Sequence, residues 1–396
     1  MLRSRLTKLC KKAIRRGVSP WWIGYRWVAR ETVPEYLERK DRAQYWCSYE
    51  TVHPREVAQN PLPCNVETRN ELPRDRGWWG FSFWDVPARA SRETFKATLP
   101  DCRVIPYIDP NDGEFWVAFL NEDERSLELD QISYRPWHGE VLRAAREVDH
   151  LKHATWILER VYRNHSHWLT AHLPKLLLLK ERGDLDDVIL PPKDARTSVM
   201  TDSLQMLGID PDTFRTFDVT RPLKVEQLTV LETDRFRPEL LQPVRDALCT
   251  SSSEAPKRKI YISRAKASRR QLVNEKDIWT RLEKKGFEKV FMEELDFATQ
   301  VGLMQQAAVV VAPHGAGLTN MMFCPVGTHV VEIADLSFPN PNFYALASAM
   351  GHHYWILEAE GLGDVHPLEK DLRIAPSIVS ETIDRIAAHP TRRTGQ

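Results

Sequence analysis

One short segment, residues 309–320, constrains the fold of this chain more than any other. Its first half is apolar and mostly β-branched (Val-Val-Val-Ala-Pro), and its second half contains a histidine and two glycines (His-Gly-Ala-Gly-Leu-Thr-Asn). This order predicts a buried strand, a tight turn and the start of a helix. Unpaired N–H groups and the helix dipole attract an anion to such a turn, where glycine allows close approach. We interpret the segment as a diphosphate site, with an ordinary strand-to-helix turn as the alternative.

The surrounding sequence alternates between strand and helix patterns. We predict strands at 258–264, 289–291, 309–312, 328–333 and 354–357, and helices at 274–285, 296–307 and 342–350. Strands that alternate with helices form right-handed βαβ units and one parallel sheet. The pattern therefore predicts an α/β fold, in which ligands bind at the carboxyl ends of the strands.

Three chemical groups fall at the carboxyl ends of these predicted strands. Arg264 offers a planar guanidinium to a diphosphate, the turn after Ala312 offers backbone donors, and Glu332 offers a carboxylate to two ribose hydroxyls. A nucleotide diphosphate needs this combination of groups. Taken singly, Arg264 is also compatible with a surface ion pair, and Glu332 with a strand-end cap.

The motifs around these residues resemble those of glycosyltransferase family 61, also known as DUF563. The matching residues are Ile262-Ser263-Arg264, Arg270, Asn274-Glu275, His314-Gly315-Ala316-Gly317-Leu318-Thr319-Asn320 and Val331-Glu332-Ile333. A second motif of that family matches residues 164–169 and 173–176. The resemblance implies that Arg264, Arg270, Glu332 and the whole 314–320 turn bind the substrate.

The resemblance also implies a fold and a reaction class. The expected fold is α/β and GT-B-like, with two Rossmann-type domains whose parallel sheets face a central cleft, and the expected enzyme is inverting and metal-independent. We expect a basic and aromatic arm at 1–30, an acceptor-side domain at 31–222, a nucleotide-sugar domain at 223–365, and a C-terminal helix and tail at 366–396 that crosses back to the first domain. The expected elements of the first domain are strands at 103–108, 115–120, 187–190 and 214–219, and a central helix at 165–180.

One position departs from the family pattern. An acidic residue is expected where this chain has Ala171, which cannot accept a proton. His165, His167 and His172 lie nearby, and a neutral imidazole is a competent base near pH 7. We predict that His167, with His165 as the next candidate, is catalytic. The alternative is a non-catalytic nucleotide- or glycan-binding protein on the same fold.

Charge bears on the partners of the chain. Its 396 residues carry 55 basic and 55 acidic side chains, a formal net charge of +0, which predicts no nucleic-acid partner. Residues 1–30 nevertheless contain nine Lys and Arg and no acid, beside Trp21, Trp22, Tyr25 and Trp27. Basic residues next to interfacial aromatics suit an anionic membrane surface. The alternative is a helix whose apolar face packs on the first domain.

Other patterns bear on cofactors and compartment. No stretch is long and apolar enough to span a bilayer, no signal peptide is evident, and the six cysteines lack metal-binding spacing. Asp184-Leu185-Asp186 precedes a predicted strand, at the wrong edge of a sheet for a diphosphate-bound metal. We therefore expect no metal, no cofactor, and a cytoplasmic bacterial enzyme that is peripheral to the inner membrane through its arm. The expected substrates are a nucleotide-sugar donor and a glycan or glycolipid acceptor in capsule or lipopolysaccharide synthesis.

Overall fold

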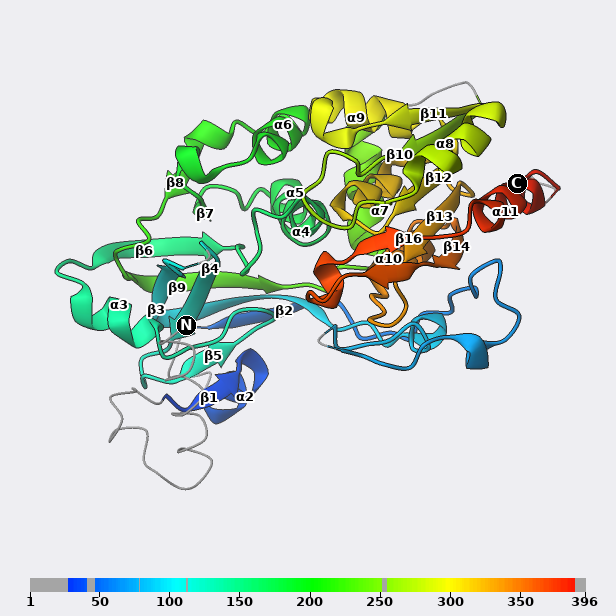
Figure 1. The fold of residues 1–396 in the computed structure, drawn as a ribbon. Coiled ribbons are helices and arrows are strands. Elements are labelled where there is room, and N and C mark those ends of the chain that lie inside the picture. Colours follow the sequence, from blue (N-terminus) through cyan, green and yellow to red (C-terminus); the bar gives the residue numbers. More distant parts are fainter. Residues whose placement is uncertain (1–27, 41–46, 78, 112, 251–254, 389–396) are drawn as a thin grey trace.

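The computed structural model describes residues 28–40, 47–77, 79–111, 113–250 and 255–388. Two parts lie side by side, each built around one sheet, with helices α4 (His165–His167) and α5 (Leu173–Arg182) between them (Figure 1). The predicted basic arm at 1–30 lies almost entirely outside the described residues, so its membrane role stays a prediction. No described helix combines the length and hydropathy that crossing a bilayer requires.

The first part contains a mixed sheet. Its described strands are ordered β1-β5-β4-β3-β9-β6-β7-β8, and β2 pairs with β3. The strands are β1 (Arg30–Thr32), β2 (Ser48–His53), β3 (Thr94–Ile108), β4 (Phe115–Leu120), β5 (Ser126–Glu128), β6 (Asp149–Trp156), β7 (Val188–Leu190), β8 (Arg215–Thr216) and β9 (Leu223–Glu232). The helices are α2 (Val33–Arg39), α3 (His138–Ala144) and α6 (Ser198–Met206).

The predicted all-parallel sheet is wrong for this first part. β3 is antiparallel to β2, β4 and β9, whereas β6, β7 and β8 are parallel to one another and to β9. Only residues 109–114 separate β3 from β4, and a parallel pair needs a crossover of a dozen or more residues. β9 lies between β3 and β6. The predicted boundary at residue 222 therefore does not separate the two sheets, because β9 completes the first one.

The second part contains the predicted parallel sheet. Its order is β11-β10-β12-β13-β14, and every neighbouring pair is parallel. The strands are β10 (Arg258–Ile262), β11 (Phe287–Val290), β12 (Ala307–Pro313), β13 (His329–Ala334) and β14 (His353–Glu358), and the helices between them are α8 (Glu275–Lys284), α9 (Phe297–Met304) and α10 (Asn342–Ala349). The strand order reverses between β10 and β12, and doubly wound sheets bind ligands at such a switch point.

The predicted central helix is confirmed, with one turn of different geometry. α4 continues through a π turn (Trp168–His172) into α5. The N–H of Leu173 bonds to the carbonyl of Trp168, five residues earlier. Pro174 follows and has no N–H for an α-helical bond to Thr170, which accounts for the change of geometry here.

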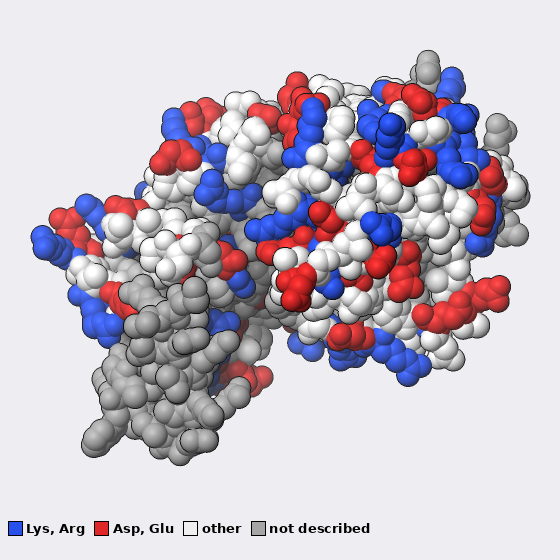
Figure 2. Space-filling model, viewed as in Figure 1, with Lys and Arg blue, Asp and Glu red and all other residues white. Residues whose placement is uncertain are grey.

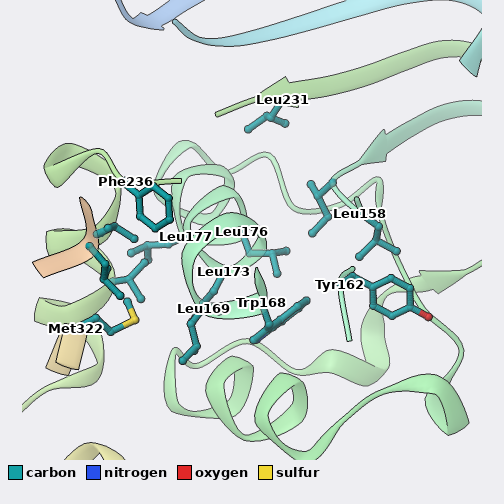
Figure 3. Close-up of a cluster of buried hydrophobic side chains, with 14 of the residues drawn as sticks. Leu158, Tyr162, Trp168, Leu169, Leu173, Leu176, Leu177, Leu231, Phe236 and Met322 are labelled. Atoms are coloured by element: carbon teal, nitrogen blue, oxygen red, sulfur yellow. The ribbon is translucent and has the colours of Figure 1, made fainter. Parts of the chain in front are cut away.

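A shared hydrophobic core joins the two parts. Figure 3 shows the apolar side chains of the central helix between residues of the first part and residues that lead into or belong to the second. The labelled core residues outside the helix are Leu158, Tyr162, Leu231, Phe236 and Met322. Burial of each leucine contributes about 1.5–3 kcal/mol relative to exposure. The packing that fixes the two parts against each other therefore also stabilises the fold.

The C-terminal helix α11 (Pro376–Ala388) forms as predicted but does not cross back to the first part. Its buried face packs on the second sheet and on α8. The segment between β2 and β3 crosses instead, in the opposite direction (Figure 1). There the N–H of Cys64 donates to the carbonyl of Tyr354 at 2.7 Å, and Asn65 bonds to both backbone groups of Ile356. The remaining elements are α7 (Pro238–Leu248), β15 (Glu360–Leu362) and β16 (Asp371–Arg373).

Acid is expected to destabilise this fold. Burial lowers the pKa of His138 and His172 to about 3 and the pKa of His352 to about 4, whereas the unfolded value is about 6.5. Below pH 6.5 the unfolded chain binds protons that the folded chain does not, so the free energy of unfolding falls by about 1.4 kcal/mol per pH unit for each histidine. Glu232 opposes part of this loss, because burial raises its pKa to about 7. Chemical denaturation at pH 7 and pH 5 measures the difference, and equal stability would contradict the expectation.

Candidate active site

A cavity of about 450 Å³ lies at the switch point of the second sheet, at the carboxyl ends of β10 and β12. We call it the turn cavity, because the turn after β12 forms one of its walls. Residues of both parts line it: His165, Ser198, Val199, Ile262, Ser263, Arg264, Lys266, Ala267, Ser268, Met292, Glu293, Leu295, Gln300, Pro313, Gly315, Gly317 and Leu318. The structure thus brings Arg264 and both glycines of the predicted diphosphate turn together, with His165 beside them.

Arg264 lies directly against Gly315. A Cβ atom on Gly315 would stand 2.0 Å from Nη1 of Arg264, so a larger residue would displace the guanidinium. Arg264 donates through Nη2 to the carbonyl of Arg269 at 2.8 Å and through Nε to the carbonyl of Arg270 at 3.3 Å. No described carboxylate forms an ion pair with it. Burial, with a contribution from Arg270, lowers the pKa of Arg264 to about 10, so the group stays charged at neutral pH and suits an anion.

The turn beside Arg264 begins a 3₁₀ helix (Ala316–Phe323). No side chain caps the N-terminus of this helix, so its first N–H groups are available to a ligand. Ala316 and Gly317 are half-buried. A Cβ atom on Gly317 would lie 3.4 Å from Cγ of Met292, which is an ordinary contact. Of the two glycines, Gly315 is therefore the one that the close approach of Arg264 requires.

Glu332 does not face the turn cavity, so the predicted ribose contact is not met. Its side chain is 0% exposed, Oε1 bonds to Nδ1 of His314, and Oε2 accepts from the hydroxyl of Tyr354. Glu332 pairs with Ala312 across β12 and β13, and His314 follows two residues later on the same side of its strand. Nε2 of His314 lies 3.2 Å from the amide nitrogen of Asn340. Glu332 therefore orients His314 beneath the turn.

The second half of the predicted binding turn lies in the core. Leu318 is 1% exposed, and Thr319 and Asn320 are 0% exposed. The amide of Asn320 donates to Oε1 of Gln300 at 2.7 Å, and its Oδ1 lies 2.8 Å from Nε2 of His165. The Asn320 side chain thus positions His165 instead of facing a ligand, and it joins the two sequence motifs.

His165 presents a neutral imidazole to the turn cavity. Because Oδ1 of Asn320 is an acceptor, Nε2 of His165 is the donor of that bond, and Nδ1 carries the lone pair. Burial lowers the pKa of His165, with Asn320 acting in the opposite direction. The ring is therefore neutral at pH 7. Sequence reasoning placed His165 second to His167, and the geometry favours the reverse order.

His167 faces a second cavity of about 1200 Å³, which we call the arginine cavity. The charged residues that line it are Arg30, Arg89, Arg92, Arg135, Arg160, Arg235, Arg269, Glu114, Glu128, Asp130, Asp234 and Glu369. Nε2 of His167 accepts from Nη1 of Arg235 at 3.2 Å. Burial and then Arg235 lower the pKa of His167 well below the usual value. A lone pair held by a guanidinium is a poor proton acceptor, so the structure argues against His167 as the base.

The other positions near the expected base are internal. Nδ1 of His172 donates to the carbonyl of His167, and Nε2 accepts from the N–H of Glu159, both at 3.0 Å. Ala171 is 0% exposed on the π turn and lines neither cavity, so the place of the expected acid lies in the core. Arg270 has a φ of 57° and contributes its carbonyl, not its guanidinium, by accepting from Arg264.

Residues 165–331 match the family model described as Glycosyltransferase 61. This part of the chain is therefore similar to a glycosyltransferase 61 domain. The matched segment begins at His165 and ends within β13. It therefore includes the Arg264 loop and the whole turn after β12, and it spans both of the motifs that Asn320 connects.

Two proteins that are similar to this chain are named transferases. The chain is 31% identical over 121 residues to the EGF domain-specific O-linked N-acetylglucosamine transferase of Drosophila melanogaster, a match that covers 29% of this chain and 22% of the relative. It is 28% identical over 199 residues to the beta-1,2-xylosyltransferase XAX1 of Oryza sativa subsp. japonica, which covers 49% of this chain and 34% of the relative. The matches thus span about a third or less of each relative. They support the predicted glycosyltransferase enzyme, and because both relatives are eukaryotic they do not support a bacterial type.

Sequence reasoning missed one carboxylate of the turn cavity. Glu293 lines the turn cavity just after β11 and is exposed. Its negative charge acts on Arg264. The sequence did contain an indication of this role, because Glu293 follows the predicted strand at 289–291, at the edge of the sheet where ligands bind. Glu293 therefore offers the cavity the carboxylate that Glu332 does not.

Metal independence stays a prediction for this chain. Within the described ranges, no three His, Cys, Asp or Glu side chains are grouped so as to hold a metal ion. Asp184, in the acidic turn considered from the sequence, forms an ion pair with Lys96 of β3. That turn therefore lies on the first sheet, outside the turn cavity.

Proposed function

We propose that this chain is an inverting, metal-independent glycosyltransferase whose nucleotide-sugar donor binds in the turn cavity. The observation that carries the proposal is the Arg264 guanidinium, which forms no ion pair with a described carboxylate and which lies against Gly315 at an uncapped helix N-terminus. A diphosphate matches this pair of groups, since its oxygens accept from a guanidinium and from backbone N–H groups together. We assign Glu293, in place of Glu332, to the ribose hydroxyls.

We assign the acceptor to the arginine cavity. His165 and His167 are two residues apart on α4, and they line the turn cavity and the arginine cavity respectively. A sugar that extends from the diphosphate therefore reaches the side of α4 from which an acceptor approaches. Trp116 lines the arginine cavity and is only half-buried, so it offers aromatic surface to a sugar ring.

In the proposed reaction, the acceptor oxygen attacks the anomeric carbon from the face opposite the diphosphate. The new C–O bond forms as the bond to the diphosphate oxygen breaks, which inverts the configuration, and the hydroxyl proton passes to Nδ1 of His165. The leaving diphosphate gains negative charge. Arg264 and the turn N–H groups stabilise that charge because they are already in place before the reaction.

We also propose a biological setting for this enzyme. The acceptor is a glycan or glycolipid of bacterial surface polysaccharide synthesis, and the enzyme works at the cytoplasmic face of the inner membrane. Support for this setting comes from the sequence pattern of residues 1–30, in which cations adjoin tryptophans.

Calorimetry with UDP, GDP and CDP tests the donor site, and transfer from a panel of nucleotide sugars tests the reaction. One of the three nucleotides is expected to bind, and proton NMR of the product should show the inverted anomer.

Transfer is expected to persist in excess EDTA. Activity that EDTA abolishes and Mg²⁺ or Mn²⁺ restores would reject the metal-free mechanism. A chain that binds a donor but neither transfers nor hydrolyses it is the alternative, a non-catalytic binding protein, which the buried Ala171 favours.

A further inference from the structure

The arginine cavity contains more positive charge than its own carboxylates neutralise. Among the described residues, seven arginines and five carboxylates line it. Each of the five carboxylates forms an ion pair with a different arginine. Two of the seven arginines, Arg135 and Arg235, remain, and no described carboxylate pairs with either. The excess is local, because Figure 2 shows charges of both signs interspersed over the face in view.

Arg235 is held in place by neutral groups alone. Its Nε and Nη2 donate to Oγ1 of Thr170 at 3.1 and 3.0 Å, and its Nη1 donates to Nε2 of His167 at 3.2 Å. Nη2 also lies 3.4 Å from Oγ of Ser166. These bonds fix the plane of the guanidinium beside α4. None of these partners is negatively charged, and burial lowers the pKa of Arg235 to about 10, while Glu159 acts in the opposite direction without contacting it.

Arg135 lies beside a tryptophan in the same cavity. Its guanidinium carbon is 5.8 Å from the ring centroid of Trp116, and Arg160 lies over the same ring at 3.9 Å. No described residue forms a hydrogen bond or an ion pair with the Arg135 guanidinium. The charge of Arg160 acts on both Arg135 and His167, and His167 in turn contacts Arg235. The cations thus form one connected group around an aromatic wall.

We propose that the arginine cavity binds the acceptor through a negatively charged group, a carboxylate or a phosphate on a sugar, which Arg135 and Arg235 hold. The inference rests on the proposed glycosyltransferase function, because that function places an acceptor glycan in this cavity. A neutral glycan would leave both guanidinium groups without an ion-pair partner, whereas an anionic oxygen group accepts their donors. The half-buried Trp116 supplies aromatic surface for a sugar ring beside that group.

The test compares charged and neutral sugars by calorimetry on the full chain saturated with the nucleotide that binds the turn cavity. The probes are cellobiuronic acid against cellobiose, and glucose 6-phosphate against glucose. At least one charged probe is expected to bind about 10- to 150-fold more tightly than its neutral counterpart, the range for hydrogen bonds to charged groups. A preference within the cellobiuronic acid pair identifies the anion as a carboxylate, and a preference within the glucose 6-phosphate pair identifies it as a phosphate.

Three variants make the test specific. Arg135→Met and Arg235→Met are each expected to remove most of the preference, and Arg135→Met loses no hydrogen bond of the fold. Arg74→Met is the matched control, since Arg74 also lies over a tryptophan, Trp84 at 5.2 Å, but outside the cavity. Equal binding of charged and neutral probes, or a preference that survives in Arg135→Met, would overturn the inference. Failure of every nucleotide to bind would instead reject the donor proposal, so the two failures are distinguishable.

Discussion

Replacing Gly315 with alanine is expected to weaken nucleoside-diphosphate binding by about 10- to 150-fold, the loss of a hydrogen bond to a charged group. The added Cβ would stand 2.0 Å from Nη1 of Arg264 and 2.7 Å from its Cζ, so the guanidinium would have to leave the turn. Gly315 has a φ of 176°, which alanine adopts without strain, so the effect acts through Arg264 and not through the backbone. Calorimetry with the nucleotide that binds the wild type measures the loss.

Three further variants separate this mechanism from general damage to the site. Arg264→Ala is expected to lose about 1.5–3 kcal/mol of binding free energy, and the double variant with Gly315→Ala is expected to lose no more than either single one, because both act on the same guanidinium. Gly317→Ala is the matched control, since its Cβ would only contact Met292 at 3.4 Å. If Gly315→Ala binds the nucleotide normally, Arg264 is not the diphosphate ligand.

The second sheet could be predicted because its residues repeat one local pattern. Apolar β-branched runs such as 309–311 end at Gly, Pro or a charged residue, and each is followed by a segment with helical spacing. Parallel pairing with crossover helices then follows from chain connectivity alone. The position of Arg264 opposite the turn is a consequence, because both follow neighbouring parallel strands, β10 and β12.

The first sheet differs from the parallel sheet that the family resemblance implied, because a short connection between strands requires antiparallel pairing. The sequence Asp-Pro-Asn-Asp-Gly at 109–113 is a strong turn signal, and it makes β3 and β4 antiparallel neighbours. β9 alternates buried and less buried residues, and pairing with the long β3 draws it into the first sheet. No local pattern in residues 223–232 reports which sheet they join, since both parts of the chain offer a strand edge.

In the site, residue type was easier to predict than residue orientation. Glu332 occupies a strand end, as expected, but its carboxylate points to the same side as His314 and forms a hydrogen bond with that ring. Asn320 belongs to the expected motif, but its amide faces Gln300 and His165. Arg235 has no motif that marks it, because its importance arises from packing against α4, far away in the sequence. Side-chain direction and long-range packing are therefore the parts of the site that the sequence did not reveal.

His165→Ala is expected to lower kcat by about 10²–10⁴-fold, the range for loss of a general base, while nucleotide affinity stays unchanged. His165 lines the turn cavity, and the Asn320 contact at 2.8 Å fixes the tautomer in which Nδ1 carries the lone pair. Asn320→Leu is therefore expected to lower kcat by a smaller factor. His167→Ala is the comparison variant. Because Arg235 donates to the His167 ring, this variant is expected to change the KM for the acceptor and to change kcat much less.

The pH profile gives an independent test of the same base. A base must be neutral to act, and burial lowers the pKa of His165, so kcat should stay constant from pH 8 to about 6.5 and fall only at lower pH. In His165→Ala this acid limb should disappear from the residual activity. A fully active His165→Ala variant would place the base elsewhere. An acid limb above pH 6.5 would also count against His165, because burial lowers the pKa of this histidine below its ordinary value.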